Sequence, residues 1–375
     1  MFGHDIRVGL VGANPEYGWG SGVHRRVLER LPGFSLQGVC TTREQSARAA
    51  STAFGAPLWF TDGAALAAHP EIDLVAICVK APHHHAVARA ALEAGKHVYC
   101  EWPLTTTLEQ SEELARLATA RGSKAMIGLH LRGSSVMQKA AQLLADGYIG
   151  DVHSVTLNAR VFGPLMRAMA TREGGTTLLS IYGGHLLDAL EHFFGELTDV
   201  SMRGAIHLPR QDETGAWVAR DAFDHVQFDG MLSNGALFNV DLSGVSLSDL
   251  GCAWRIDGRE GTLMIETRDP TLPGIESLVL RGARRGGLFE PIDTGEGSMA
   301  LPSVPDRFSC YPNTPASREA LDCVGTLYTR LGEAIRGQRP VEPDFARAVH
   351  IQRSIAKLDS TVAVPTSFVP AGASS

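Results

Sequence analysis

Ile6-Arg7-Val8-Gly9-Leu10-Val11-Gly12 is the stretch that decides the fold of the N-terminal half. This apolar run leads into Ala13-Asn14-Pro15-Glu16-Tyr17-Gly18-Trp19-Gly20-Ser21-Gly22, and a segment with helical spacing follows. Glycines at such a bend let backbone N–H groups approach a pyrophosphate at a helix N-terminus, where the helix dipole favours anions. The spacing departs from G-x-G-x-x-G, because Asn14 stands where the second glycine is expected and the turn extends through Gly18 and Trp19. The stretch predicts a dinucleotide-binding turn, with an ordinary strand–helix loop as the alternative.

Short apolar runs alternate with helical segments over the first 125 residues. The expected strands are Ile6–Val11, Ser35–Cys40, Leu74–Val79, His97–Cys100 and Lys124–Leu129. The expected helices are Val23–Arg30, Arg43–Phe54, Ala64–Ala68, His84–Ala94 and Leu108–Arg121. Alternation of this kind indicates βαβ units, and near-continuous apolar runs are typical of parallel strands covered by helices on both faces. We therefore predict an α/β Rossmann-type domain over residues 1–130.

From Asp151 the pattern changes to longer, more polar strands joined by Gly and Asp turns. The expected strands are Val152–Val161, Phe223–Phe228, Ala236–Ser243, Ala253–Asp257, Gly261–Glu266 and Ser277–Leu280. The expected helices are Ser135–Asp146 with Gly147 as its stop, Gly184–Phe194, Arg318–Arg336 and Asp344–Asp359, and the expected loops are Arg203–Gly215 and Asp293–Thr314. This predicts an α+β domain over residues 131–365 with a large, open-faced, mostly antiparallel sheet. The C-terminal helices can pack back on the first domain, and residues 366–375 are expected to be disordered.

Length and charge exclude several classes of protein. A chain of 375 residues favours two domains, and 44% apolar with 20% charged residues is ordinary globular composition. The net charge of −7 argues against a nucleic-acid partner, because no basic excess is available to neutralise phosphates. We find neither a signal peptide nor the roughly 20 apolar residues that cross a bilayer. With six cysteines and no C-x-x-C spacing, we expect a cytoplasmic protein without a membrane partner.

The end of the second strand indicates which nicotinamide nucleotide is preferred. An NAD-binding domain usually places an acid there to hold the ribose 2′-hydroxyl. This chain has Thr41, Thr42 and Arg43, and its first carboxylate is Glu44. A guanidinium and two hydroxyls suit a 2′-phosphate, so we predict NADP as the preferred cofactor and NAD as the other option. The alternative is that Arg43 is a solvated residue of the first helical turn.

Several motifs occur in order along nearly the whole chain. Ile72–Ile77 is followed by Pro82-His83-His84-His85, and then by the run from Ala94 to Glu101-Trp102-Pro103-Leu104. Asp146–Val152 and Gly183-Gly184-His185-Leu186-Leu187-Asp188 come later. Together these motifs resemble the Gfo/Idh/MocA oxidoreductases, which include glucose–fructose oxidoreductase and inositol dehydrogenases. The resemblance implies a Rossmann domain joined to an open-faced domain whose sheet often forms a dimer interface, and hence a homodimer or homotetramer.

The resemblance also implies a cofactor cleft at the carboxyl ends of the parallel strands. Its expected lining, with the turn residues above, is Gly12, Asn14, Gly18, Trp19, Thr41, Thr42, Arg43, Ile77, Lys80, His84, Glu101 and Trp102. Glu101 is expected to bind a nicotinamide-ribose hydroxyl, whereas Lys80 is either a source of positive charge or a solvated loop lysine. Substrate contacts are expected from Trp102, His130, Arg132, Arg160 and His185.

Two positions depart from the family pattern. The usual Glu-Lys-Pro has Trp102 in place of its lysine, and the usual aspartate four residues before the motif histidine is replaced by Ile181. Together with the Gly18-Trp19 turn, the Glu101-Trp102 pair resembles the branch that contains the fungal galactose-pathway co-repressor, which binds a dinucleotide without clear turnover. The remaining catalytic candidates are His185 as acid/base, with Asp188 to orient it and Tyr182 as a hydrogen-bond donor. Their alternatives are a structural helix histidine and a packed tyrosine.

Three functions follow from these residues. The first is an NADP(H)- or NAD(H)-dependent oxidoreductase that acts on a sugar, polyol or derivative. The second is a non-catalytic dinucleotide-binding regulatory or sensor protein, and the third is a redox-assisted glycosidase or lyase. No metal is expected, because adjacent His83, His84 and His85 cannot all face one ion.

Overall fold

The computed structural model describes residues 5–161, 166, 169–209, 217–246, 251–267, 278–295, 309–311, 314–315, 318–360 and 362. The chain divides into two compact units. The first unit combines residues 1–135 with 295–350, and the second combines 136–294 with 351–375. The sequence prediction instead assigned the continuous range 131–365 to one domain, with C-terminal helices free to pack back on the first. The structure groups helix α9 (Arg318–Ile335) with the first unit.

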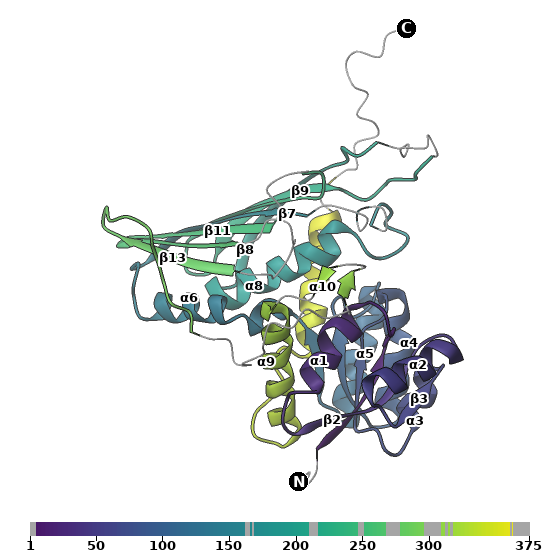
Figure 1. Ribbon diagram of the computed structural model, residues 1–375. Coiled ribbons are helices and arrows are strands. Elements are labelled where there is room, and N and C mark those ends of the chain that lie inside the picture. The colour runs from purple at the N-terminus through teal and green to yellow at the C-terminus, as the bar shows by residue number, and fades with distance from the viewer. Residues whose placement is uncertain are drawn as a thin grey trace. The chain divides into compact units, whose positions relative to one another are not determined.

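A six-stranded parallel sheet forms the centre of the first unit, in the order β3-β2-β1-β4-β5-β6. The strands are β1 (Ile6–Val11), β2 (Phe34–Cys40), β3 (Leu58–Phe60), β4 (Leu74–Ile77), β5 (His97–Glu101) and β6 (Ala125–Gly128). The helices are α1 (Arg25–Leu28), α2 (Glu44–Phe54), α3 (Gly63–Ala68), α4 (His84–Glu93) and α5 (Leu108–Arg121), with the short segments η1 (Gly20–His24), η2 (Ala81–His83) and η3 (His130–Gly133). The predicted Rossmann-type fold is confirmed (Figure 1).

The order of the strands determines the edge of this unit at which a ligand is expected to bind. β1 lies between β2 and β4, so successive connections leave β1 in opposite directions at this point of the sheet. In open parallel sheets, ligands bind at the carboxyl ends of strands where the order reverses. β4 is buried along its whole length, as its unbroken apolar sequence predicts. The carboxyl ends of β1, β2, β4 and β5 therefore form the edge on which the predicted nucleotide residues lie.

Helix α9 covers part of this sheet although it lies late in the chain. It packs against α1, β6, η1 and η3. Its buried residues recur at helical spacing and include Ala320, Val324, Leu327, Tyr328 and Leu331. The close approach to η3 requires glycine, since a Cβ at Gly133 would lie 2.3 Å from the carbonyl oxygen of Cys323.

An eight-stranded sheet forms the second unit, in the order β14-β13-β12-β11-β7-β10-β9-β8 (Figure 1). Its strands are β7 (Val152–Arg160), β8 (Leu197–Ala205), β9 (His225–Leu232), β10 (Leu237–Ser243), β11 (Gly251–Gly258), β12 (Gly261–Thr267), β13 (Leu278–Arg284) and β14 (Glu290–Pro291). All described pairings are antiparallel except that of β7 with β10, which confirms the predicted mostly antiparallel sheet. Helices α6 (Ser135–Ala145), α8 (Gly184–Phe194) and α10 (Phe345–Ser360) are described, with η4 (Leu179–Gly183) directly before α8.

Part of the loop prediction was wrong. Residues 203–205 belong to β8. The prediction failed here because Met202 is the single buried residue of this strand, so the strand lacks the apolar run that marks a strand in sequence. Short strands β15 (Ser309–Tyr311) and β16 (Thr314–Pro315) occur within the predicted loop Asp293–Thr314. The predicted strand residue Ser277 and the predicted disordered tail 366–375 lie outside the described residues.

No helix in the described part of the chain is long and apolar enough to cross a membrane. Cys40, Cys78, Cys100 and Cys323 are free thiols. A cytoplasmic location stays a prediction.

Candidate functional site

The glycine turn after β1 is tightly packed. Gly12 has a φ of +97°, and a Cβ there would lie 2.5 Å from the carbonyl oxygen of Cys78. A Cβ at Gly20 would lie 2.7 Å from the carbonyl oxygen of Gly12, so the start of η1 presses directly on the end of β1. The backbone N–H groups of Gly12 and Ala13 both donate to the carbonyl of Cys40. Those two amides are therefore hydrogen-bonded inside the fold, and phosphate binding by the turn stays a prediction.

Two further predicted turn residues have local roles. The Asn14 side-chain oxygen accepts hydrogen bonds from the backbone N–H groups of Glu16 at 2.8 Å and Tyr17 at 3.3 Å. The Asn14 carbonyl accepts a hydrogen bond from the hydroxyl of Ser21. Gly18 has a φ of +114° and open space around it. Asn14 thus fixes the shape of the turn, and Gly18 supplies its left-handed residue.

Exposed side chains surround the carboxyl ends of β2 and β4. Thr42 and Arg43 are exposed after β2, and Arg43 makes no side-chain cap at the start of α2. The hydroxyl of Thr41 donates to the carbonyl of Arg43 at 3.0 Å. Lys80 is exposed after β4, whereas Ile77, the last residue of that strand, is fully buried. Arg43 and Lys80 therefore offer solvated positive charge at the edge where the sheet order reverses.

Glu101, the last residue of β5, lies between two histidines. Its Oε1 is 2.7 Å from Nε2 of His24, and its Oε2 is 2.9 Å from Nε2 of His130. Nδ1 of His24 is 2.8 Å from the hydroxyl of Tyr328. The carboxylate fits here because residue 128 is glycine, since a Cβ at Gly128 would lie 2.9 Å from both of its oxygens. A buried Tyr–His–Glu–His cluster thus occupies the end of β5.

The charge of Glu101 is stabilised by these contacts. Burial alone raises the pKa of a carboxyl group, but the charge and hydrogen bond of His130, followed by those of His24, bring the pKa of Glu101 well below its usual value. The nearby thiols behave oppositely, because burial and the Glu101 charge raise the pKa of Cys78 and of Cys100 well above the ordinary value. Glu101 is therefore ionised at neutral pH, and these two thiols are not thiolate nucleophiles there.

His84 and Trp102 are buried beside this cluster. Nδ1 of His84 lies 2.9 Å from the carbonyl oxygen of Pro103, and Nε2 lies 2.8 Å from that of Val79. Burial lowers the pKa of His84, more than these carbonyls raise it. Trp102 is only 6% exposed. The ring of His84 thus lies between the turn after β5 and the segment after β4 and can donate to one of the two carbonyls, which is a structural role.

His130 and Arg132, the predicted substrate contacts of η3, are buried in the first unit. The ring of Trp19 stacks on that of His130, with 5.1 Å between centroids. Arg132 is 3% exposed and pairs through Nη1 with Glu342 at 3.0 Å. The structure therefore brings Trp19, His130 and Glu101 together, and it directs Arg132 to a different carboxylate.

The predicted catalytic residues lie in the second unit. Tyr182 is in η4, and His185 and Asp188 are in α8. Tyr182 and His185 are partly buried, and Asp188 is 1% exposed. A spacing of three residues places His185 and Asp188 on neighbouring parts of the helix surface. Their proposed cooperation stays a prediction.

Arg160, the remaining predicted substrate contact, ends β7 on the sheet face opposite the buried Leu157 and Ala159. Its Nη1 lies 2.5 Å from Oδ1 of Asp241, and Asp241 also contacts Nε2 of His225 at 3.3 Å. Burial opposes ionisation of Asp241, but Gln227, Arg160 and His225 together lower its pKa. Arg160 thus belongs to a polar network on the sheet, and its contact with substrate stays a prediction.

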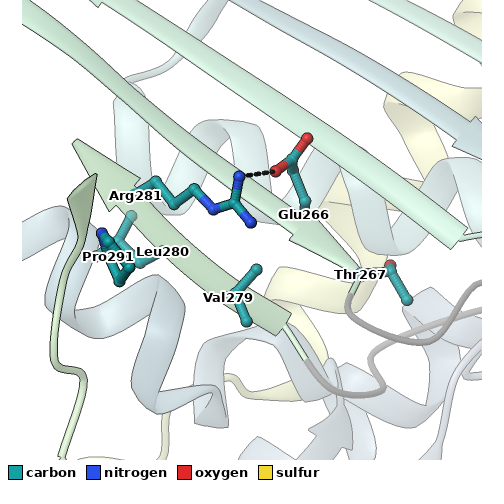
Figure 2. Close-up of a pocket in the computed structure, with 6 residues that line it drawn as sticks. All are labelled: Glu266, Thr267, Val279, Leu280, Arg281 and Pro291. Atoms are coloured by element: carbon teal, nitrogen blue, oxygen red, sulfur yellow. Dashed lines mark ion pairs between the residues drawn. The ribbon is translucent and has the colours of Figure 1, made fainter. Parts of the chain in front are cut away.

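A pocket of about 380 Å³ lies on the second unit, and none of its lining residues is a predicted site residue (Figure 2). Its lining consists of Glu266, Thr267, Val279, Leu280, Arg281 and Pro291. Figure 2 shows Arg281 and Glu266 pointing toward one another from neighbouring strands, with Nη1 and Oε2 4.0 Å apart. The two charges therefore pair with one another, and the pocket adds no nucleophile or acid–base dyad.

Sequence reasoning missed His24 and Tyr328. His24 is separated from Glu101 by 77 positions and from Tyr328 by 304. In the sequence, the only sign of His24 or Tyr328 is a polar side chain on an otherwise apolar helix face. Among the described residues, no group of three His, Cys, Asp or Glu side chains is placed to hold a metal ion.

Comparison with known proteins identifies the family. A model described as an oxidoreductase family with an NAD-binding Rossmann fold, Gfo/Idh/MocA, matches residues 6–129. A model of the Gal80p C-terminal domain matches residues 135–267. Residues 6–129 therefore match the Gfo/Idh/MocA family, and residues 135–267 match the Gal80p C-terminal domain. The family assignment made from the motifs is confirmed.

The relatives of this chain include both dehydrogenases and regulators. The dehydrogenase aclE of Aspergillus oryzae is 32% identical over 217 residues, which are 55% of this chain and 59% of that protein. The galactose/lactose metabolism regulatory protein GAL80 of Kluyveromyces lactis is 28% identical over 330 residues, 78% of this chain and 69% of that protein. A levoglucosan dehydrogenase solved with NADH and levoglucosan has a TM-score of 0.78 at 20% identity, covering 96% of this chain and 98% of that one. At 20% identity, the similarity to levoglucosan dehydrogenase shows the fold alone.

Proposed function

We propose that this protein is a nicotinamide-dinucleotide-dependent oxidoreductase that acts on a sugar, a polyol or a derivative. The observation that supports this most is the set of groups at the carboxyl ends of β1, β2, β4 and β5. A glycine-packed turn, exposed Arg43 and Lys80, and ionised Glu101 all belong to that edge of one sheet. The site on the first unit is the nucleotide site, and Tyr182, His185 and Asp188 on the second unit supply the chemistry.

The residues present fit a dinucleotide. At Gly12 and Gly20 a Cβ would collide with backbone, so the chain can make this tight turn only with glycine. Thr42 and Arg43 supply a hydroxyl and a guanidinium for the adenosine ribose and its 2′-phosphate, because an Arg fork matches phosphate geometry. The side chain of Glu101 remains 11% exposed, which leaves an acceptor edge for a ribose hydroxyl.

A bound nicotinamide supplies a hydride acceptor or donor. The chain must supply the proton transfer, and His185 is the proposed acid/base, since it takes the hydroxyl proton of an alcohol as hydride departs. Asp188 orients the imidazole and Tyr182 donates a hydrogen bond to the reacting oxygen. Trp102, in place of the family lysine, gives the site an apolar wall instead of a cation.

Turnover with a panel of sugars and polyols tests this function. Purified protein is incubated with NADP⁺ or NAD⁺, and reduced cofactor is followed by its absorbance. We expect reduction with at least one sugar class and a loss of about 100-fold or more in His185→Ala, because general acid–base catalysis contributes factors of this order. Glu191→Ala, a change three residues beyond Asp188 on the same helix, is the control. Full activity of the His185→Ala variant contradicts the proposed role of His185 as the acid/base.

NADP is the proposed preference. Arg43 is exposed after the end of β2, and the residues between this strand and Arg43, Thr41 and Thr42, are not acidic. Arg43→Ala is expected to weaken NADP⁺ binding about tenfold or more and NAD⁺ binding by less than about twofold, because hydrogen bonds to charged groups contribute roughly 1.5 to 3 kcal/mol. Calorimetric titration of both nucleotides measures the ratio. An unchanged ratio contradicts the assignment.

A second candidate function is a dinucleotide-binding regulator without turnover. It is favoured by the Gal80p-like C-terminal domain and by Trp102 and Ile181 at the positions of the family lysine and aspartate. Tight binding of a nucleotide without product from any sugar supports this candidate, and turnover that depends on His185 excludes it.

A further inference from the structure

A buried chain of four polar side chains joins α9 to the carboxyl end of β5. The Tyr328 hydroxyl contacts Nδ1 of His24, whose Nε2 contacts Glu101, and Glu101 in turn contacts His130. Tyr328 and His24 are both fully buried. The four residues come from α9, η1, β5 and η3, so only the tertiary fold brings them together.

The carboxylate sets the direction of each hydrogen bond. An ionised Glu101 only accepts, so His24 and His130 each donate from Nε2. A neutral imidazole that donates from Nε2 accepts at Nδ1, and the Tyr328 hydroxyl is the group within 2.8 Å of that atom in His24. A neutral His24 thus accepts from Tyr328 at Nδ1 and donates to Glu101 from Nε2, whereas a protonated His24 donates to both, so Tyr328 is the partner of Nδ1 in either state.

Four buried ionisable side chains near Glu101 are uncharged at neutral pH, namely Tyr99, Cys78, Cys100 and His84. Burial and the Glu101 charge raise the pKa of Tyr99, Cys78 and Cys100, and burial lowers the pKa of His84. The guanidinium of Arg25, one residue after η1, instead contacts the carbonyl of Ser21 and the carboxylate of Glu29. Cys323 on α9 also has a raised pKa, caused by burial and by Glu319 and Asp322. The rings of His24 and His130 are therefore the groups that stabilise the Glu101 carboxylate.

Helix α9 is fixed against both histidine segments. It packs on η1, which carries His24, and on η3, which carries His130. The carbonyl of Cys323 lies so near Gly133 that no other residue fits there. The hydroxyl of Tyr328 is consequently held at a constant place relative to His24.

We infer that Tyr328 is a positioning residue of the nucleotide site, which through His24 holds Glu101 in place to accept a hydroxyl of the dinucleotide's ribose. A carboxylate has about four acceptor positions, and two imidazole N–H groups leave the others available. This inference rests on the proposed nucleotide binding. It assigns a role in that site to a helix that lies more than 200 residues beyond β5 in the sequence.

Tyr99 provides a matched control. Its ring stacks on that of Tyr328 with 4.8 Å between centroids, and it is equally buried. Its hydroxyl has no hydrogen-bond partner among the residues that the structure describes. Tyr328→Phe and Tyr99→Phe therefore delete the same atom from the same environment, but only the first breaks the chain.

Two measurements on the full chain test the inference. The first is the ¹⁵N spectrum of the histidine rings without nucleotide, in which Tyr328→Phe is expected to shift the Nδ1 resonance of His24 and Tyr99→Phe to leave it in place. The second is calorimetric titration with NADP⁺ and NAD⁺. We expect about fivefold to tenfold weaker binding in Tyr328→Phe, which is roughly one hydrogen bond, and less than about twofold in Tyr99→Phe. Gly128→Ala displaces the same carboxylate without touching Tyr328 and is expected to weaken binding as well.

The outcomes separate the inference from the function on which it rests. If the wild-type protein binds nucleotide and both tyrosine variants bind it equally well, the positioning role is wrong and the proposed function stands. If the wild-type protein binds neither nucleotide, the proposed function fails together with this role, and the ring spectrum still reports whether Tyr328 controls His24. An unshifted His24 resonance in Tyr328→Phe overturns the inference in either case.

Discussion

Glu101 makes stability depend on pH. Its pKa lies far below the ordinary value of 4.5, so its contribution is complete above about pH 4.5 and is lost as pH falls toward the folded-state pKa. Glu101→Gln is expected to lower the free energy of unfolding by about 2 kcal/mol at pH 7, because hydrogen bonds to a charged group are lost. Urea denaturation from pH 7 to 3 measures the difference, which should shrink below pH 4.5.

Glu113 supplies the comparison for this experiment. Its carboxylate also contacts a histidine, His85, at 2.9 Å, but the side chain is 41% exposed. Solvent screens such a pair, so Glu113→Gln is expected to have little effect at any pH. A deficit in Glu101→Gln that stays constant down to pH 3 means that the buried carboxylate is not the cause.

Sequence could indicate the types of residue in the site but not their pairings. Glu101 was expected to bind the cofactor and His130 to contact substrate, because the family resemblance assigns these roles to residues at the ends of the two strands. The contact of His24 with Tyr328 depends on where α9 packs, and nothing local to either residue encodes that position. Arg132 shows the same limit, since its partner Glu342 lies 210 positions away.

At the scale of elements, long apolar segments were predicted well and short or exposed ones were not. β1, α5 and α8 have the predicted bounds. β3 was missed because three half-buried residues give no periodic signal. β8 was missed because only one of its residues, Met202, is buried, so the strand has no apolar run in the sequence.

η3 and α9 approach each other most closely at Gly133, where a substitution is expected to destabilise the protein. Gly133→Ala places a Cβ 2.3 Å from a backbone oxygen, and no side-chain rotation relieves that clash. We expect a loss of roughly 2 to 3 kcal/mol in the free energy of unfolding, as for other overpacked sites. Urea denaturation measures it, with Gly174→Ala as the control, because a Cβ at Gly174 meets nothing closer than 4.0 Å. Equal stabilities of the two variants contradict the close approach.

At the scale of the whole molecule, nucleotide binding should act on one unit. A ligand stabilises the unit that binds it, by about 2.7 kcal/mol at 100 times the dissociation constant. Hydrogen exchange with and without NADP⁺ is expected to show added protection in β1, β4 and β5 and also in α9, because they share the first unit. The strands of the eight-stranded sheet should change little. Protection that spares α9 contradicts its membership of the nucleotide-binding unit.

The oligomeric state is a separate whole-molecule expectation. We predict a homodimer or homotetramer, because an open-faced sheet such as that of the second unit leaves one face available to another copy. Light scattering after size exclusion gives the mass directly, and a monomer at micromolar concentration contradicts the prediction.

The first unit is assembled from both ends of the chain, and this affects how it matures on the ribosome. Its sheet strands emerge early, but the tyrosine that satisfies His24 is translated only after the whole eight-stranded sheet has been made. Until α9 has been synthesised, the apolar surface that it covers stays exposed to water, and the nascent N-terminal part can form incorrect contacts. The first unit therefore cannot complete its folding until the strands of the second unit's sheet have been synthesised, although its own strands are synthesised first.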